Sequence, residues 1–562
     1  MHKKLLLLIA AVLACLLVAG CASAASASLS DIYVQPASDD PETVSPHAVY
    51  FFQKNTTDAY LFLPAGMDPS SLRVFCGDVK EFIVDGVTMV SGEETGLFGR
   101  LLGQTVPIRA AGKKLDLTIM QSENLPALFL TTESGSLDYV ETKKGNKETG
   151  AMTVLETDGS TSYTGSLAHI KMHGNGTLTY GKKKPYEIKL EEKASLLGMA
   201  KDKTWILLAN VRDNSLIRNK IALDMALEVG IGYSVHSAFV DVYINNRYRG
   251  NYTLTEKVEV GKNRVAITDL GDATEALNDQ PLNSYARYGK VDYKFNTQKA
   301  YQIPNDPEDI TGGYLMEFEL SYRYTSASSG FVTRHGQSVV MKTPKHASAA
   351  QILYISGLMQ ELEEAVFSED GINPTTGKHY YEYADKDSLA LLCVLEEVVK
   401  NYDGNRSSLY FYKPADSEST LVYAGPGWDF DQIMDAGGRK IQLGSRKAII
   451  TNSTTSSNWF PKLYQISDFR QRVQELYTEK FVPCLAILLG EQEDGTYLKS
   501  VQSYKDQISA SAAMNFARWG YVNMTEARRV GSTFDKAISY IQTFMTERRE
   551  WLDSMWLIHG QE

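Results

Sequence analysis

The chain has 562 residues, of which 43% are hydrophobic and 22% are charged, and its formal net charge is −11. This length is enough for two or more compact domains, and the acidic balance argues against a nucleic acid as partner, because nucleic-acid-binding surfaces carry an excess of Lys and Arg. Of the five cysteines, Cys76, Cys393 and Cys484 are widely spaced and show no disulfide framework or zinc-binding spacing.

The first 20 residues have the pattern of a bacterial lipoprotein signal peptide. A basic start precedes an apolar stretch too short to span a membrane comfortably, and small residues lead up to Cys21. We expect a lipid on Cys21 that anchors the protein to the bacterial membrane outside the cytoplasm; retention of a Cys21→Ser variant on membranes would contradict this. An ordinary signal peptide cut slightly later is the alternative. Residues 21–46 are small, polar and acidic, as in a flexible tether.

Residues 47–122 contain short alternating apolar runs separated by Gly, Pro, Asn and Asp. This pattern predicts a small β-sandwich. It contains no group of residues that indicates chemistry, so a spacer or binding module is the simplest interpretation.

A glycine-rich loop lies between two expected strands, 169–173 and 186–190. The loop contains Gly174, Asn175, Gly176 and Thr177. Its backbone N–H groups can approach phosphate oxygens. Lys189 alternates with Glu187 on the polar side of the second strand. A plain glycine-rich hairpin beside solvated lysines is the alternative.

The following residues predict a helix that ends near Gly230, a hairpin over 239–256 and a polar insertion over 261–311. Helices are expected to dominate afterwards. One of them, over 386–400, leads directly to Asp403.

Three aspartates flank an expected hairpin with strands at 408–413 and 420–423. Antiparallel pairing places Asp403, before the first strand, and Asp429, after the second, at the same end of the hairpin. Converging carboxylates repel one another unless a cation or proton intervenes. Asp429 and Asp431 could both face a hard cation such as Mg²⁺, while Asp403 accepts a proton. Capping of a turn or helix is the alternative role for Asp429 and Asp431.

The order of these parts is that of a protein kinase: glycine-rich loop, lysine strand, helix, hairpin, helical half, and an Asp on either side of a hairpin. The motifs closely resemble the CotH (spore coat protein H) family of atypical secreted kinases. The matching segments are 175–177, 182–190, 205–210, 217–219, 239–245, 250–258, 312–315 and 423–431. Several matches in the family's order are more specific than any single motif.

The resemblance implies an α+β chain with a two-lobed, protein-kinase-like fold, preceded by the small β-sandwich. The kinase-like part would cover 123–562, with a β-rich N-lobe over about 123–260, the insertion over about 261–311 and a mainly helical C-lobe over about 312–562.

The resemblance also implies site residues and cofactors. Lys189 would contact the α- and β-phosphates of ATP, Asp403 would be the catalytic base, and Asp429 would hold Mg²⁺ or Mn²⁺. Residues 255–258, including Glu256, would form the hinge beside adenine. Ser408 stands where a typical kinase has a metal-binding Asn, so Asn405 or Asp431 would take the second metal position.

Three functions compete at this point. The main hypothesis is a membrane-anchored kinase that phosphorylates Ser or Thr hydroxyls of a protein substrate. A non-catalytic surface lipoprotein that keeps the kinase fold as a binding or adhesion module is the second. Glycoside hydrolysis by Asp403 and Asp429 is the third, but it leaves the lysine strand and the glycine-rich loop without a role.

Overall fold

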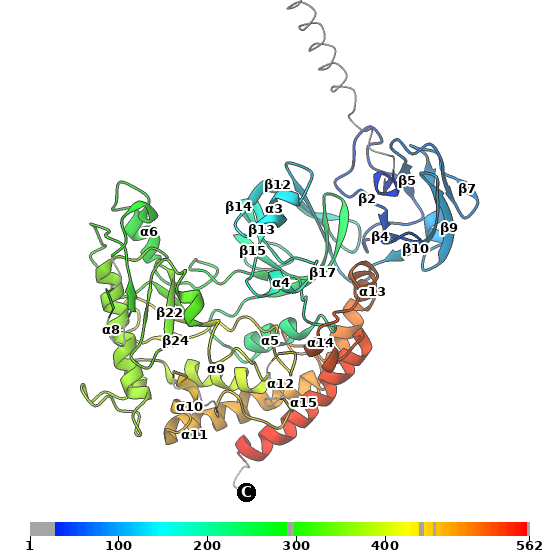
Figure 1. The fold of residues 1–562 in the computed structure, drawn as a ribbon. Helices are drawn as coiled ribbons and strands as arrows, with labels where there is room; N and C mark the ends of the chain where they lie inside the picture. The colour runs from blue at the N-terminus through cyan, green and yellow to red at the C-terminus, as the bar shows by residue number, and fades with distance from the viewer. Residues whose placement is uncertain (1–27, 289–290, 293–296, 438–442, 453–456, 559–562) are drawn as a thin grey trace, which may run out of the picture. The chain divides into compact units, whose positions relative to one another are not determined.

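The computed structural model describes residues 28–288, 291–292, 297–437, 443–452 and 457–558 (Figure 1). The predicted signal peptide and the lipidation site Cys21 lie outside the described residues. The chain is mixed α+β. It divides into two compact units, Met1–Ser122 with Asn246–Tyr248, and Glu123–Asn245 with Arg249–Glu562. In the part of the chain that is described, no helix combines the length and apolarity needed to cross a membrane.

The first unit contains two sheets, with strand orders β2-β1-β5-β8 and β3-β4-β10-β9-β6-β7. Its elements are η1 (Leu29–Asp31), β1 (Tyr33–Pro36), β2 (Val49–Tyr50), β3 (Phe52–Gln53), β4 (Asp58–Leu63), β5 (Leu72–Phe75), β6 (Phe82–Val84), β7 (Val87–Thr88), β8 (Glu94–Thr95), α2 (Leu97–Arg100), β9 (Thr105–Ala110) and β10 (Lys113–Gln121). β1 lies inside the segment 21–46 that the composition assigns to a tether. Ile32 and Val34 are fully buried there, and β1 pairs with both β2 and β5, so this part of the segment belongs to a sheet.

The second unit begins with a closed barrel, ordered β11-β12-β13-β14-β15-β17-β16. Its strands are β11 (Ala127–Thr132), β12 (Lys147–Leu155), β13 (Thr161–Met172), β14 (Tyr186–Ala194), β15 (Asp202–Leu208), β16 (Ser237–Ile244) and β17 (Arg247–Glu256), with α3 (Asp138–Thr142), α4 (Thr177–Tyr180) and α5 (Arg218–Glu228) between them. Alternate residues of β14, namely Tyr186, Ile188 and Leu190, join the apolar core of the barrel. Glu187 and Lys189 therefore share the opposite face of this strand.

A second sheet follows, ordered β18-β19-β21-β22-β20-β23-β24. Its strands are β18 (Val291–Asp292), β19 (Thr297–Lys299), β20 (Tyr314–Glu319), β21 (Gly330–Val332), β22 (Ser338–Thr343), β23 (Leu409–Lys413) and β24 (Tyr423–Ala424). α6 (Leu270–Glu275) and η2 (Leu282–Ser284) precede β18, and α7 (Ser321–Tyr324) lies between β20 and β21. β23 and β24 pair antiparallel, which is the hairpin that the sequence predicts. β20 pairs with β23 and joins the hairpin to the rest of the sheet.

The remaining elements are mainly helical. They are α8 (Ala349–Val366), η3 (Tyr380–Glu382), α9 (Lys386–Val398), α10 (Trp459–Leu463), α11 (Ser467–Leu476), the π-helical turn η5 (Tyr477–Phe481), α12 (Val482–Leu488), α13 (Val501–Trp519), α14 (Thr525–Arg529) and α15 (Phe534–Trp556). α9 starts after Asp385, whose carboxylate accepts a hydrogen bond from the Ser388 backbone N–H. The helix packs against α11 and α15 (Figure 1). Its buried residues belong to a large apolar core that includes residues of β20, β23 and the C-terminal helices.

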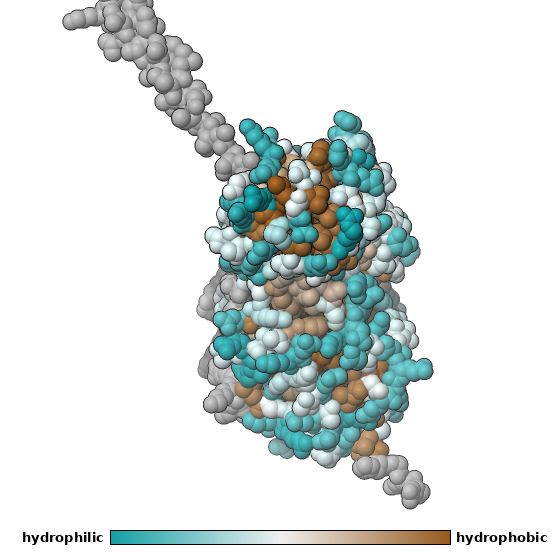
Figure 2. Space-filling view, turned by 90° about the vertical axis from the view of Figure 1, so that its right-hand side faces the viewer, coloured by the Kyte–Doolittle hydropathy of each residue, from teal (hydrophilic) through white to brown (hydrophobic). Residues whose placement is uncertain are grey.

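The surface in Figure 2 carries hydrophilic side chains over much of its area, with apolar side chains in smaller groups between them. This is the usual distribution for a protein whose large apolar residues are mostly inside.

Candidate functional site

A cavity of about 860 Å³ lies in the second unit, between the barrel and the sheet that contains β20 and β23. Its volume is in the range of small-molecule binding sites. The charged side chains that line it are Lys144, Lys171, Glu187, Arg212, Lys257, Glu259, Asp269, Glu317, Glu319, Arg323, Lys342, Lys345, Asp403, Asp429 and Asp431. Both signs of charge are therefore concentrated around one space.

The β23–β24 hairpin brings Asp403 and Asp429 to the same wall of this cavity. The Ser408 hydroxyl donates a 2.9 Å hydrogen bond to Asp429 Oδ2. Ser408 and Asp429 have φ angles of 61° and 66°, in the left-handed region that non-glycine residues rarely adopt. Ser408 directly precedes β23, whereas Asp429 follows β24 after residues 425–428, and their side chains meet in this hydrogen bond.

Asn401, which follows α9, connects the two aspartates. Its Oδ1 accepts a 3.2 Å hydrogen bond from the Asp403 backbone N–H, and its Nδ2 lies 3.5 Å from the Asp429 carbonyl oxygen. The Asp403 carboxylate also accepts hydrogen bonds from Gln432 Nε2 and, at 3.3 Å, from Arg406. The position of Asp403 is thus fixed by its neighbours on both sides.

The electrostatics of this wall are unfavourable for carboxylates. Burial and then the charge of Asp403 raise the pKa of Asp429 to about 6. Burial and then the charge of Asp429 raise the pKa of Asp431 well above its usual value. Since like charges close together resist ionisation, a cation here would stabilise the charged forms.

The donor chemistry fits Mg²⁺ or Mn²⁺. Within the described residues, no group of three or more His, Cys, Asp and Glu side chains is arranged to hold a metal ion by itself. Mg²⁺, however, commonly takes one or two protein carboxylates and completes its shell with phosphate and water oxygens. Asp429 and Asp431 meet that requirement.

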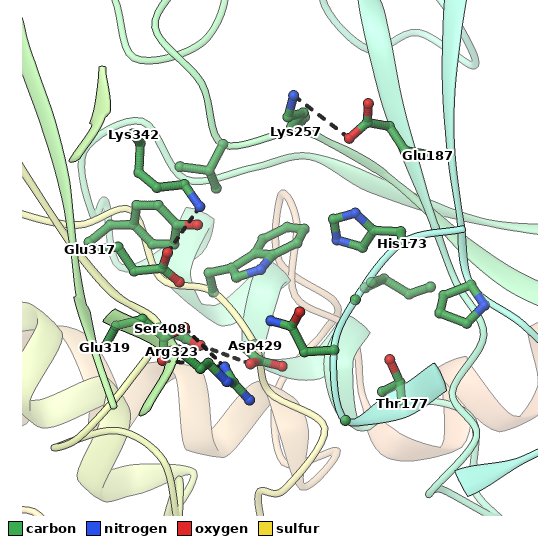
Figure 3. Close-up of a pocket in the computed structure, with 18 of the residues that line it drawn as sticks. His173, Thr177, Glu187, Lys257, Glu317, Glu319, Arg323, Lys342, Ser408 and Asp429 are labelled. Carbon is green, nitrogen blue, oxygen red and sulfur yellow. Dashed lines mark hydrogen bonds and ion pairs between the residues drawn. The ribbon is translucent and has the colours of Figure 1, made fainter. Parts of the chain in front are cut away.

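The barrel wall of the cavity is arranged around Glu187 of β14. Its carboxylate lies 2.7 Å from Lys171 Nζ and 3.7 Å from Lys257 Nζ, and it contacts His169 at 3.1 Å. Burial alone would raise the pKa of Glu187, but the His169 hydrogen bond and the two lysines outweigh burial and lower it. This carboxylate is therefore ionised and holds two lysines at the cavity. Figure 3 shows its contact with Lys257.

The opposite sheet contributes two further ion pairs. Lys342 Nζ lies 2.9 Å from Glu317, and Arg323 lies 3.1 Å from Glu319. Figure 3 shows Arg323 directed toward the Ser408–Asp429 pair. The Arg323 guanidinium therefore lies close to the wall that carries Asp403 and Asp429.

The glycine-rich loop also lines the cavity, through Gly174, Asn175, Gly176 and Thr177. Gly174 has a φ of 82°, and a Cβ at this position would come within 2.4 Å of Thr177 Oγ1. Glycine is therefore required there both for the backbone conformation and for space. Burial lowers the pKa of the adjacent His173 to about 4, so this imidazole is neutral near pH 7.

The remaining residues selected from the sequence lie elsewhere. Lys189 is not among the described residues that line this cavity; it pairs with His169 of β13, one pleat beyond the Lys171–Glu187 pair. The Glu256 carboxylate contacts Arg264 at 2.8 Å and His236 at 3.1 Å in a separate cavity of about 160 Å³. Asn405 Nδ2 donates to the carbonyl oxygens of Ile449 and Ile450.

The basic side chains of the cavity were not selected from the sequence as phosphate contacts, and only Lys257 lies within the expected hinge. They are Lys144, Lys171, Arg212, Lys257, Arg323, Lys342 and Lys345. A signal for Lys171 was available: it lies two residues before His173 on an expected strand, and directly opposite Glu187 once the two strands pair. Arg323 and Lys342 come from a distant part of the chain, and nothing local to them indicates the cavity.

The fold and site together define an α+β protein in which lysines and aspartates face one another across a cavity of small-molecule size. A family model described as CotH kinase protein matches residues 170–552, more than half of the chain, and the chain therefore belongs to this family. The family resemblance expected from the sequence is confirmed, and the chain is a kinase-like protein. A search of curated proteins found no match.

Proposed function

We propose that the protein is an ATP-dependent kinase that transfers the γ-phosphate to Ser or Thr hydroxyls of a protein substrate. The observation that carries the proposal is the cavity in which Asp403, Asp429 and Asp431 face the lysines around Glu187. Phosphoryl transfer needs a positioned polyphosphate, a metal-binding carboxylate and a carboxylate that accepts the hydroxyl proton. Membership of the kinase family supports the same assignment.

The roles follow from the surroundings of each side chain. Asp403, oriented by Asn401 and Gln432, would accept the proton of the attacking hydroxyl. Asp429 and Asp431 would hold Mg²⁺ or Mn²⁺, which supplies charge neutralisation to the phosphates when bound. Lys171 and Lys257, held by Glu187, would contact phosphate oxygens.

We also propose that the barrel and the following helical part correspond to the two lobes of a kinase. Each has its own apolar core, and Lys257 and Val258, directly after the last barrel strand, line the cavity. In this arrangement the hinge beside adenine would be formed by residues 257–258.

The decisive experiment compares Asp429→Asn with the wild type, using the purified full chain in mild detergent. The amide keeps the shape of the side chain and a hydrogen-bond partner for Ser408, but it removes a metal ligand. We expect MgATP to raise the melting temperature of the wild type and not of the variant, and phosphorylation of a Ser-rich protein to fall by at least about a hundredfold.

Asp416, at the other end of the β23–β24 hairpin, provides the control. It pairs with Lys413 at 2.7 Å, and its side chain is 43% exposed. Asp416→Asn should leave both measurements unchanged. A wild type that is as inert as Asp429→Asn, with no stabilisation by MgATP, would favour the non-catalytic binding module instead.

A further inference from the structure

Lys144 enters the cavity from a turn that precedes the family-matched residues 170–552. The turn follows α3. The Asn146 backbone N–H donates to the Lys143 carbonyl oxygen, and Asn146 Nδ2 donates at 2.8 Å to the Tyr139 carbonyl oxygen. Gly145 has a φ of 102°, as such a tight turn requires. Lys144 is therefore presented by an ordered backbone.

The ammonium group of Lys144 donates a hydrogen bond to Asn175 Oδ1. Asn175 belongs to the glycine-rich loop, so the contact connects the α3 turn to the loop at the cavity. The two residues are 31 positions apart in the sequence. Their contact places a positive charge beside backbone that already lines the site.

The partners of Lys144 differ from those of the neighbouring cations. Lys171 and Lys257 lie within 4 Å of Glu187, whereas the ion pairs among the described residues include none with Lys144, whose hydrogen-bond partner is a neutral amide. Partial burial, followed by the like charges of Arg323, Lys342 and Lys171, lowers the pKa of Lys144, and the charge of Glu319 has a smaller opposite effect. Lys144 thus faces other cations, and an anion between them would relieve their repulsion.

We propose that Lys144 binds the phosphate groups of the nucleotide, as a polyphosphate contact contributed by a turn outside the family-matched residues. This inference rests on the proposed kinase function. The phosphates would lie between the glycine-rich loop and the wall that carries Asp403 and Asp429, and they would carry several negative charges. Lys144, Lys171 and Arg323 would approach them from different elements. The residue would discriminate nucleoside triphosphates from nucleosides, because only the phosphates reach it.

The test is titration calorimetry of the full chain in detergent with MgATP and with adenosine, for Lys144→Met and Lys143→Met. Lys143 is the adjacent lysine; it is exposed and is not among the described residues that line the cavity. Since Lys144 keeps much of its surface exposed, we expect Lys144→Met to weaken MgATP binding about fivefold. Adenosine binding should not change, and Lys143→Met should match the wild type with both ligands.

Two further measurements keep the result interpretable. Lys144→Arg keeps the charge and should retain MgATP affinity within about twofold of the wild type. Melting temperatures without ligand should agree among all variants, since the side chain is exposed.

The inference is overturned if Lys144→Met binds MgATP as tightly as the wild type, or if Lys143→Met loses the same amount, which would indicate a general charge effect. In both cases the proposed function stands, because the wild type still binds MgATP. A wild type that binds neither MgATP nor adenosine would remove the proposed function and this inference together.

Discussion

The two walls of the cavity differ in how their charged side chains are arranged. The barrel wall contains Glu187 and its lysines, and the hairpin wall contains Asp403, Asp429 and Asp431. On the barrel wall, the Glu187 carboxylate lies between Lys171 and Lys257, so charges of opposite sign alternate. On the hairpin wall, like charges converge, and burial followed by the neighbouring carboxylates raises the pKa values of Asp429 and Asp431. The cluster around Glu187 is therefore electrostatically satisfied by its own residues, whereas the hairpin wall requires a cation to be stable in its charged form.

Carboxylates that repel one another keep their positions only if the backbone around them is held firmly. Contacts between α9 and α15 contribute to this. Arg548 of α15 lies 2.6 Å from Glu397 of α9, and both side chains are 0% exposed. Arg548 also donates to the carbonyl oxygens of Ser445 and Lys447. Glu397 accepts hydrogen bonds from the backbone N–H groups of residues 449–451. This buried pair joins the helix before Asp403 to the segment after Asp431.

The largest expected effect comes from breaking that support. Arg548→Met leaves the Glu397 carboxylate buried without its cation, so we expect the free energy of unfolding to fall by about 3 to 5 kcal/mol. Chemical denaturation monitored by circular dichroism measures this change. The adjacent Arg549, which pairs with Glu491 near the surface, is the control, and Arg549→Met should cost less than about 1 kcal/mol. Equal losses in the two variants would contradict the role given to the buried pair.

An intermediate effect distinguishes two lysines of the barrel, of which only Lys171 lines the cavity. Lys171 contacts Glu187 at the cavity, whereas Lys189 lies one pleat further along β14. Lys171→Met should weaken MgATP binding about tenfold by removing a charge-assisted contact. Lys189→Met should change it by less than about threefold.

Titration calorimetry measures both affinities. The opposite ranking would return the phosphate contact to Lys189, as the family resemblance implies. It would also show that the paired charges around Glu187 do not form the phosphate-binding part of the wall.

The smallest effect concerns His173 and pH. Its pKa of about 4 in the folded protein lies below the ordinary value of 6.5. Between these two pH values, the imidazole binds a proton in the unfolded chain but not in the folded protein. The stabilising contribution is complete above pH 6.5 and is lost as the pH falls through 4.

Between pH 7 and pH 5.5, the wild type should lose about 1 kcal/mol more stability than His173→Gln, as measured by urea denaturation in a pH series. Glu187 favours the charged imidazole, while Lys144, Lys257 and Lys342 oppose it. If the stability of the two proteins depends on pH in the same way, the fold does not keep His173 unprotonated and this prediction is wrong.

Local patterns in the sequence predicted much of the hairpin wall. The apolar periodicity and cap of α9, the two short strands and the flanking aspartates all lie within about 50 residues, and antiparallel pairing alone brings Asp403 and Asp429 together. By contrast, β1 was not expected, because the composition of residues 21–46 is typical of a tether. Its burial depends on pairing with β2 and β5, which the composition of the segment itself does not indicate.

The lysine of the barrel that lines the cavity could not be selected in the same way. Lys171 and Lys189 both lie on strands next to the glycine-rich loop, and a strand pattern does not say which end of a strand borders a cavity. Only the register, in which Lys171 faces Glu187 and Lys189 faces His169, separates them. Lys144, Arg323 and Lys342 reach the cavity from three other segments, and these contacts exist only after the barrel closes and the sheet packs.

The sequence by itself determined the family, the mixed α+β class and the pairing of Asp403 with Asp429, because each depends on motifs or on periodicity over short distances. The tertiary structure decided which cations face those aspartates and which residues hold them in place. The physical reason is that a carboxylate's partner is set by distance in space, and the Arg548–Glu397 pair joins residues 151 positions apart.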